Sequence, residues 1–219
     1  MNIKEVLLMD LKARNEEMRD FFNRKADGYD DVHGSMMDNK RSILHHLPEH
    51  VSQVLDLGAG TGLELVALFE RYPEAHVRVI DISSAMLEQL KNRPFAERLD
   101  IVCGDFFAED LGCGYDAVIS SAALHHFDEA EKLLLYRRIW DSLKPGGMFV
   151  NSDRCSATPE EEERDFAEYA QDPHRWPHMD TPMTAEHEMQ ILHQVGFVSV
   201  GHEVLPDPRY QTTFGRKPI

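Results

Sequence analysis

Three glycines at alternate positions mark the turn where this chain is best equipped for chemistry. Gly58, Gly60 and Gly62 follow the apolar segment 51–57. Because glycine has no Cβ atom, such a turn can adopt positive φ angles and let a ligand lie against bare main chain. The helix expected from about Leu63 would point its free N–H groups into the turn, where they suit the carboxylate or ribose of a nucleotide-like ligand.

A carboxylate is expected beside that turn. Asp81 ends a second apolar strand, Val77–Ile80, about twenty residues further on, where it can accept hydrogen bonds from ribose hydroxyls. Dinucleotide-binding turns read G-x-G-x-x-G, but Leu63 stands at the third glycine position here. Since no Tyr-x-x-x-Lys pair occurs either, the residues argue against an NAD(P) oxidoreductase.

Five segments follow one another with the order and spacing of one family's motifs. They are Asp56–Gly62, Asp81–Leu87, Gly104–Phe107, Tyr115–Phe127 and Leu143–Val150. In this order they resemble motifs one to five of the class I S-adenosylmethionine (SAM)-dependent methyltransferases. Upstream, Ala26–Asp31 is similar to the opening segment of members that act on small molecules, and the resemblance covers roughly residues 21–205.

The resemblance implies how SAM would be held. Asp81 would bind the ribose, and Tyr29 would close over the methionine part. Asp105 would meet the adenine amino group, with Phe106 beside the ring and Met86 on its face. The expected cofactor-binding residues are Tyr29, Asp56, Gly58, Ala59, Gly60, Asp81, Ile82, Met86, Gly104, Asp105, Phe106 and Ser121. Within this set, Asp56 is expected to organise the glycine turn.

Methyl transfer needs alignment more than acid or base catalysis, because a sulfonium is already a good leaving group. Tyr29 and His126 are the candidate catalytic residues. His126 could act as a base because histidine titrates near neutrality, but the family carries the His125–His126 pair whatever its substrate. His125 is interpreted as structural or as a neighbour of the sulfonium.

No metal ion is predicted. Two histidine pairs, His46 with His50 and His174 with His178, invite a metal hypothesis. Neither pair has cysteine or carboxylate partners at the spacing of a metal site.

The alternation of elements predicts an α/β fold. Strands are expected at 51–57, 77–81, 99–103, 116–120 and 146–151, with a closing hairpin of 197–205 and 210–217. Helices are expected at 62–71, 84–92, 129–142, from Thr158 and at 184–195. This pattern predicts a Rossmann-like, seven-stranded mixed sheet, mostly parallel with an antiparallel C-terminal hairpin, and helices on both faces. Asp56, Asp81, Asp105 and Ser121 would then gather at the carboxyl ends of the strands.

The whole chain, residues 1–219, is interpreted as one domain. Residues 1–47 have a helical apolar period and include a second expected helix near Met36–Leu47. They would form a lid over the site or simply a helix laid over the domain edge. Residues 152–185 are interpreted as an insertion that covers the substrate, with His174, Arg175, Trp176, His178 and Met179 in its centre.

The amino-acid composition limits the classes of partner that this protein is expected to bind. Lys and Arg total 23 against 39 Asp and Glu, which gives a formal charge of −16. Such a charge repels nucleic acid and anionic membranes, and no apolar run is long enough for a membrane span. The N-terminus has no export-signal pattern, and three widely spaced cysteines suit reduced thiols. A cytoplasmic location is therefore expected.

The sequence as a whole predicts a SAM-dependent methyltransferase that transfers a methyl group to a small-molecule acceptor by in-line displacement. Two alternatives stay open at this point. The protein could use a SAM-derived cofactor to transfer another group, with Arg154 holding an extra carboxylate, or it could bind SAM without catalysis as a scaffold. The acceptor atom and the oligomeric state, a homodimer included, are not determined by these residues.

Overall fold

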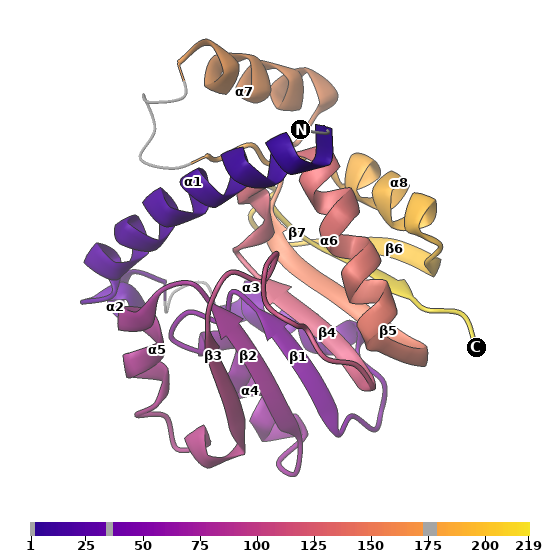
Figure 1. Cartoon of the computed structure of the whole chain (residues 1–219). Coiled ribbons are helices and arrows are strands. Elements are labelled where there is room, and N and C mark those ends of the chain that lie inside the picture. The colour runs from indigo at the N-terminus through magenta and orange to yellow at the C-terminus, as the bar shows by residue number, and fades with distance from the viewer. Residues whose placement is uncertain (1–2, 34–36, 173–178) are drawn as a thin grey trace.

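A seven-stranded sheet forms the centre of the computed structural model, which describes residues 3–33, 37–172 and 179–219 (Figure 1). The strands are β1 (Gln53–Leu57), β2 (His76–Asp81), β3 (Leu99–Cys103), β4 (Tyr115–Ser121), β5 (Leu143–Arg154), β6 (Val198–Val204) and β7 (Tyr210–Arg216). Their order is β3-β2-β1-β4-β5-β7-β6. Strands β1 to β5 run parallel, and β7 is antiparallel to both β5 and β6. The predicted fold class is confirmed.

Helices cover both faces of this sheet (Figure 1). The α-helices are α1 (Ile3–Lys25), α2 (Tyr29–His33), α3 (Met37–Arg41), α4 (Leu63–Arg71), α5 (Ser84–Leu90), α6 (Glu129–Ser142), α7 (Pro159–Gln171) and α8 (Ala185–Val195). Short 3-10 helices are η2 (Ser42–His46), η3 (Ala96–Arg98) and η4 (Leu124–His126). Two hydrophobic cores lie on opposite faces of the sheet, and successive residues of β1 contribute to them in turn. Leu55 belongs to the core that includes side chains of α6 and α8, and Val54 to the core that includes side chains of α4 and α5.

Local signals fix several helix ends where the sequence predicts them. The Asp128 carboxylate accepts a hydrogen bond from the Glu131 N–H, and the Glu131 carboxylate accepts one from the Asp128 N–H, both at 2.9 Å. This capping box opens α6. Thr158 caps α7 with Pro159 in the first turn, and Gly196 ends α8 in a left-handed conformation.

Two predicted elements differ from the structure. The described part of the helix expected near Met36–Leu47 is not one α-helix but α3 followed by η2, with residues 34–36 outside the description. The Ser42 hydroxyl bonds to Asn39 O and to Thr212 of β7, which ties this segment to the sheet. The strand expected at 146–151 is longer, because β7 pairs with β5 as far as Arg154.

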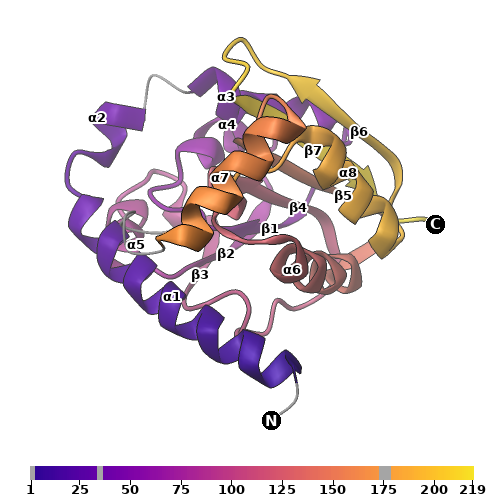
Figure 2. The same ribbon diagram turned by 90° about the horizontal axis from the view of Figure 1, so that it is seen from above.

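Helix α1 runs past the carboxyl ends of the strands on the side of α5 and α6, and Figure 2, which looks down on that edge, shows α7 over the strands and α1 alongside them. Arg14 of α1 contacts both carboxylate oxygens of Glu131 in α6 at 2.8 Å. At the other side, Asn23 Oδ1 accepts hydrogen bonds from the Ser83 hydroxyl and the Ala85 N–H of the α5 start. α1 therefore bridges α5 and α6 above the sheet edge. None of the described helices combines the length and apolar character needed to cross a membrane.

Candidate active site

A cavity opens at the carboxyl ends of β1, β2 and β4, beneath α1. Twelve of the thirteen residues that the sequence proposes for cofactor binding or catalysis line it: Tyr29, Gly58, Ala59, Gly60, Asp81, Ile82, Met86, Gly104, Asp105, Phe106, Ser121 and His126. The exception is Asp56, which is fully buried behind the cavity wall.

The turn after β1 leaves one glycine open to this cavity. Gly58 and Gly60 have φ angles of 78° and 53°, in the left-handed region that favours glycine. A Cβ atom on Gly58 would lie 2.5 Å from the Cβ of Ala123, whereas a Cβ on Gly60 would have no described atom within 4 Å. Packing therefore requires a glycine at position 58, and position 60 leaves room for a ligand.

Asp81 ends β2 with its carboxylate held in place by the main chain. Its Oδ2 accepts a hydrogen bond from the Gly60 N–H and its Oδ1 one from the Ser83 N–H, each at 2.7 Å. The residue is only 8% exposed. Burial raises the pKa of Asp81 to about 6, although the two N–H donors oppose that rise.

Asp105 and its aromatic neighbours form one end of the cavity. The Asp105 Oδ1 accepts a hydrogen bond from the Phe107 N–H at 2.8 Å, and its Oδ2 accepts one from Asn15 Nδ2 of α1 at 2.8 Å. The Phe106 ring lies 5.5 Å from that of Phe127, edge to face. This end combines a fixed carboxylate with apolar ring faces, which suits a flat heterocycle with N–H groups.

A buried ion pair forms the opposite end. The Lys40 ammonium contacts Glu64 Oε2 at 3.0 Å and donates to the Ser121 hydroxyl at 3.1 Å. Burial lowers the pKa of Lys40, but the charges of Glu64, Tyr29 and Asp56 and the hydrogen bond to Glu64 together outweigh that effect and leave the pKa raised. Glu64 Oε1 is buried without a hydrogen-bond partner in the described part of the chain. Burial also raises the pKa of Tyr29, which lies close to this pair.

Asp56 supports this end from beneath. Burial, and next the charge of Glu64, raise the pKa of Asp56 well above its ordinary value. This favours a protonated Asp56, which relieves the repulsion of two buried carboxylates. Neither carboxylate oxygen of Asp56 has a hydrogen-bond partner in the described part of the chain, so its role in organising the turn stays a prediction.

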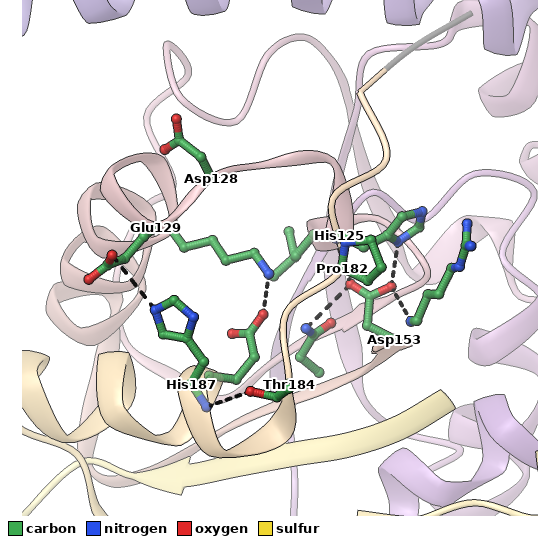
Figure 3. A network of polar contacts seen from close by, with 12 residues as sticks. His125, Asp128, Glu129, Asp153, Pro182, Thr184 and His187 are labelled. Atoms are coloured by element: carbon green, nitrogen blue, oxygen red, sulfur yellow. Dashed lines mark hydrogen bonds and ion pairs between the residues drawn. The ribbon is translucent and has the colours of Figure 1, made fainter. Parts of the chain in front are cut away.

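The two adjacent histidines have different partners. Asp153 turns its carboxylate toward the His125 ring (Figure 3), with Oδ1 2.6 Å from Nδ1. Its Oδ2 accepts the N–H groups of Leu124 and His125, so Asp153 fixes η4. His126 instead places Nδ1 2.7 Å from the Met179 carbonyl. A carbonyl only accepts hydrogen bonds, so Nδ1 carries the proton, and in a neutral ring the acceptor lone pair is on Nε2.

The predicted substrate cover is described only in part. His174, Arg175, Trp176 and His178 lie outside the described residues, and Met179 is buried. Arg154, considered for an extra carboxylate of a modified cofactor, forms an ion pair with Asp180. Asp180 thus engages one nitrogen of the guanidinium from within the chain, and the modified-cofactor alternative stays a prediction.

The sequence predicts residues 1–47 as a lid or an edge helix, but it did not single out the side chains that reach the cavity from this region and from the start of α4. Asn15, Met18 and Phe22 of α1 line the cavity, as do Lys40 and Glu64. No motif marks these positions. The available signal was an asparagine on an otherwise apolar helical face and a glutamate in the first turn after the glycines.

Comparisons with known proteins agree with this geometry. Residues 54–147 match a family model described as a methyltransferase domain. Residues 54–147 therefore contain a methyltransferase domain, which confirms over this segment the resemblance to class I SAM-dependent methyltransferases that the sequence motifs indicate.

Two methyltransferases illustrate how similar the chain is to known relatives and how much of each aligns. The malonyl-acyl-carrier-protein O-methyltransferase of Priestia megaterium is 28% identical over 148 residues, which cover 64% of this chain and 52% of that protein. The 3-hydroxy-5-methyl-1-naphthoate 3-O-methyltransferase of Streptomyces sahachiroi is 30% identical over 106 residues, covering 47% and 31%. The chain thus spans about half the length of the first methyltransferase. It aligns with less than a third of the second.

Solved methyltransferase structures share the fold. Human N-acetylserotonin methyltransferase, whose structure is a complex with SAM, superposes with a TM-score of 0.70 at 20% identity. The superposition covers 90% of this chain and 56% of the human one. At that identity the likeness bears on the fold alone.

Proposed function

We propose that this protein transfers a methyl group from SAM to an oxygen atom of a small-molecule acceptor. The observation that carries the proposal is the convergence of Gly60, Asp81 and Asp105 on one cavity, within a methyltransferase fold. Gly60 offers bare main chain, Asp81 a buried carboxylate for ribose hydroxyls, and Asp105 an acceptor for an amino group on a heterocycle.

The other end of the cavity fits the methionine part of SAM. That part carries an ammonium and a carboxylate, and the cavity presents the complementary pair, Glu64 and Lys40. Glu64 Oε1 is a buried acceptor without a described partner, which an ammonium group would satisfy. Tyr29 lines the same end and would close over it.

Bound SAM would supply an electrophilic methyl group on a sulfonium. The protein's own part is to align that group with the acceptor and to exclude water. Met18 and Phe22 of α1 cover the cavity with apolar surface, consistent with residues 1–47 acting as a lid on a single domain of residues 1–219. Residues 152–185 would bound the acceptor side.

The acceptor is proposed to be a hydroxyl group. Relatives named for O-methylation include one that acts on a hydroxynaphthoate. A hydroxyl must lose its proton when it is methylated, and His126, with its proton held on Nδ1 by Met179, has the tautomer of a base at Nε2.

Binding of SAM tests the proposal at Gly60. Gly60→Ala should weaken SAM and S-adenosylhomocysteine binding by at least about tenfold in calorimetric titration, because the added methyl group occupies space left for the ligand. Gly114→Ala is the matched control, since Gly114 also has a positive φ and no described atom within 4 Å of its Cβ position, away from the cavity. Both variants should lose about 1–2 kcal/mol of stability from the left-handed backbone. Wild-type protein that is folded but binds neither ligand would refute the proposal.

Replacement of His126 tests the catalytic role. His126→Gln should lower kcat with a hydroxyl acceptor by about 100-fold or more, while SAM affinity stays the same. The acceptor is first found by following labelled methyl transfer to a panel of phenols, aliphatic alcohols and carboxylic acids. A loss smaller than about tenfold would exclude His126 as the base, and SAM binding without transfer to any acceptor would favour a non-catalytic role.

Two further expectations belong to this proposal. The three cysteines are all free thiols, which suits a reducing, cytoplasmic compartment. A homodimer is the simplest oligomer for such a domain, and light scattering of the purified chain would measure its mass.

A further inference from the structure

We infer that Asn15, on helix α1, reads the amino group of the adenine ring and so selects the nucleoside that the site accepts. The inference rests on the proposed function, because it assumes that the ligand is SAM. It adds a specificity-determining residue to the Asp105 end of the cavity, and it gives the lid a direct contact with the cofactor.

The orientation of the Asn15 side chain is fixed by its neighbour. Asn15 is 4% exposed, and its Nδ2 lies 2.8 Å from Asp105 Oδ2. A carboxylate only accepts hydrogen bonds, so the amide nitrogen must face Asp105 and the amide oxygen must face elsewhere. Asp105 is itself held by the Phe107 N–H on its other oxygen, so the pair forms a rigid unit.

The amide oxygen of Asn15 is left without a donor. Oδ1 is buried and has no hydrogen-bond partner in the described part of the chain, while the residue lines the cavity beside Asp105 and Phe106. Buried polar atoms nearly always have a partner, and an unpaired one is unfavourable. The missing donor is therefore expected on the ligand.

Adenine has a group that can donate two hydrogen bonds, one to each of these acceptors. Its exocyclic amino group carries two hydrogens, which can be shared between the carboxylate of Asp105 and the amide oxygen of Asn15. A 6-oxo purine would place an oxygen against both acceptors. Flipping the Asn15 amide would not help, because its oxygen would then face the Asp105 carboxylate.

The position of Asn15 links this contact to the lid. The preceding residue, Arg14, contacts both oxygens of Glu131 at 2.8 Å, so α1 is held on α6 at the level of the adenine end. The amino group would complete the hydrogen bonding of a helix that is already docked. A purely structural Asn15, which only holds α1 on the Asp105 loop, would affect all nucleosides equally.

The test compares two ligands in calorimetric titration: S-adenosylhomocysteine and S-inosylhomocysteine, which differ at the 6-position of the purine. Wild-type protein should prefer the adenosyl ligand by at least about tenfold. Asn15→Ala should weaken adenosyl binding about five- to tenfold and reduce the preference by at least the same factor. Glu16→Ala, an exposed position on the same helix, should change neither.

The outcomes distinguish a failure of the role of Asn15 from a failure of the proposed function. If Asn15→Ala weakens both ligands equally, or neither, Asn15 does not read the purine, and the proposed function is untouched. If wild-type protein binds neither ligand, the proposed function fails, and this inference with it. Asn15→Leu, which keeps the side-chain volume without hydrogen-bonding groups, supplies the same comparison should the alanine variant unfold.

Discussion

Asp81→Asn is expected to weaken SAM binding by about a hundredfold at pH 7.5, the largest loss of affinity from any single substitution at this site. Two hydrogen bonds from ribose hydroxyls to a charged acceptor are each worth about 1.5–3 kcal/mol. The asparagine amide would also turn an N–H toward the N–H of Gly60 or Ser83, which both donate to Asp81 now. Calorimetric titration measures the change, and Asp100→Asn, an exposed carboxylate on β3, is the control.

The same carboxylate predicts a pH dependence of binding. The pKa of Asp81 is raised to about 6 by burial in the protein without ligand. Ribose hydroxyls donate to the ionised form, so binding lowers that pKa. Affinity is therefore nearly complete above about pH 7 and falls as the pH drops through 6. At pH 5 the affinity should be about tenfold weaker than at pH 8. Wild-type affinity that is constant from pH 8 to 5, or an equal dependence in Asp81→Asn, would contradict this role.

Lys132→Met should cost about 3–5 kcal/mol of stability, the largest effect expected outside the site. Lys132 is 1% exposed, and its ammonium is paired with Glu188 of α8. The other oxygen of Glu188 accepts a hydrogen bond from the Tyr136 hydroxyl at 2.6 Å. Removing the lysine leaves a buried carboxylate without its counter-charge, and denaturant unfolding followed by circular dichroism measures the loss.

Two comparisons make that prediction specific. Lys91→Met breaks an exposed pair with Glu88 and should cost less than about 1 kcal/mol. The double substitution Lys132→Met with Glu188→Leu removes both charges and should recover much of the lost stability. A double variant no more stable than Lys132→Met alone would mean that the buried charge is not the cause.

The elements that local residues specify are the ones that sequence predicts well. The glycine turn, the carboxylate at the end of β2 and the caps of α6 and α7 each depend on neighbours within a few positions. Strand order then brought the predicted residues to one edge, because parallel strands end on the same side.

The contributions from α1 and α3 were not predictable in this way. Asn15 meets Asp105 across 90 positions, and Lys40 meets Ser121 across 81. Such contacts depend on how a helix docks, and a single amphipathic period does not specify that. The break between α3 and η2 has the same origin, since Ser42 is drawn to β7 by a contact that lies far away in the sequence.

Glu131 has two functions with one carboxylate, and this limits how helix α1 could be exchanged or removed. The group caps the first turn of α6 and also holds Arg14, while the residue is 1% exposed. A shortened chain that begins after α1 would leave the Glu131 carboxylate without the guanidinium that balances its charge. Exchanging the N-terminal region between related proteins therefore requires that both Arg14 and Glu131 are transferred.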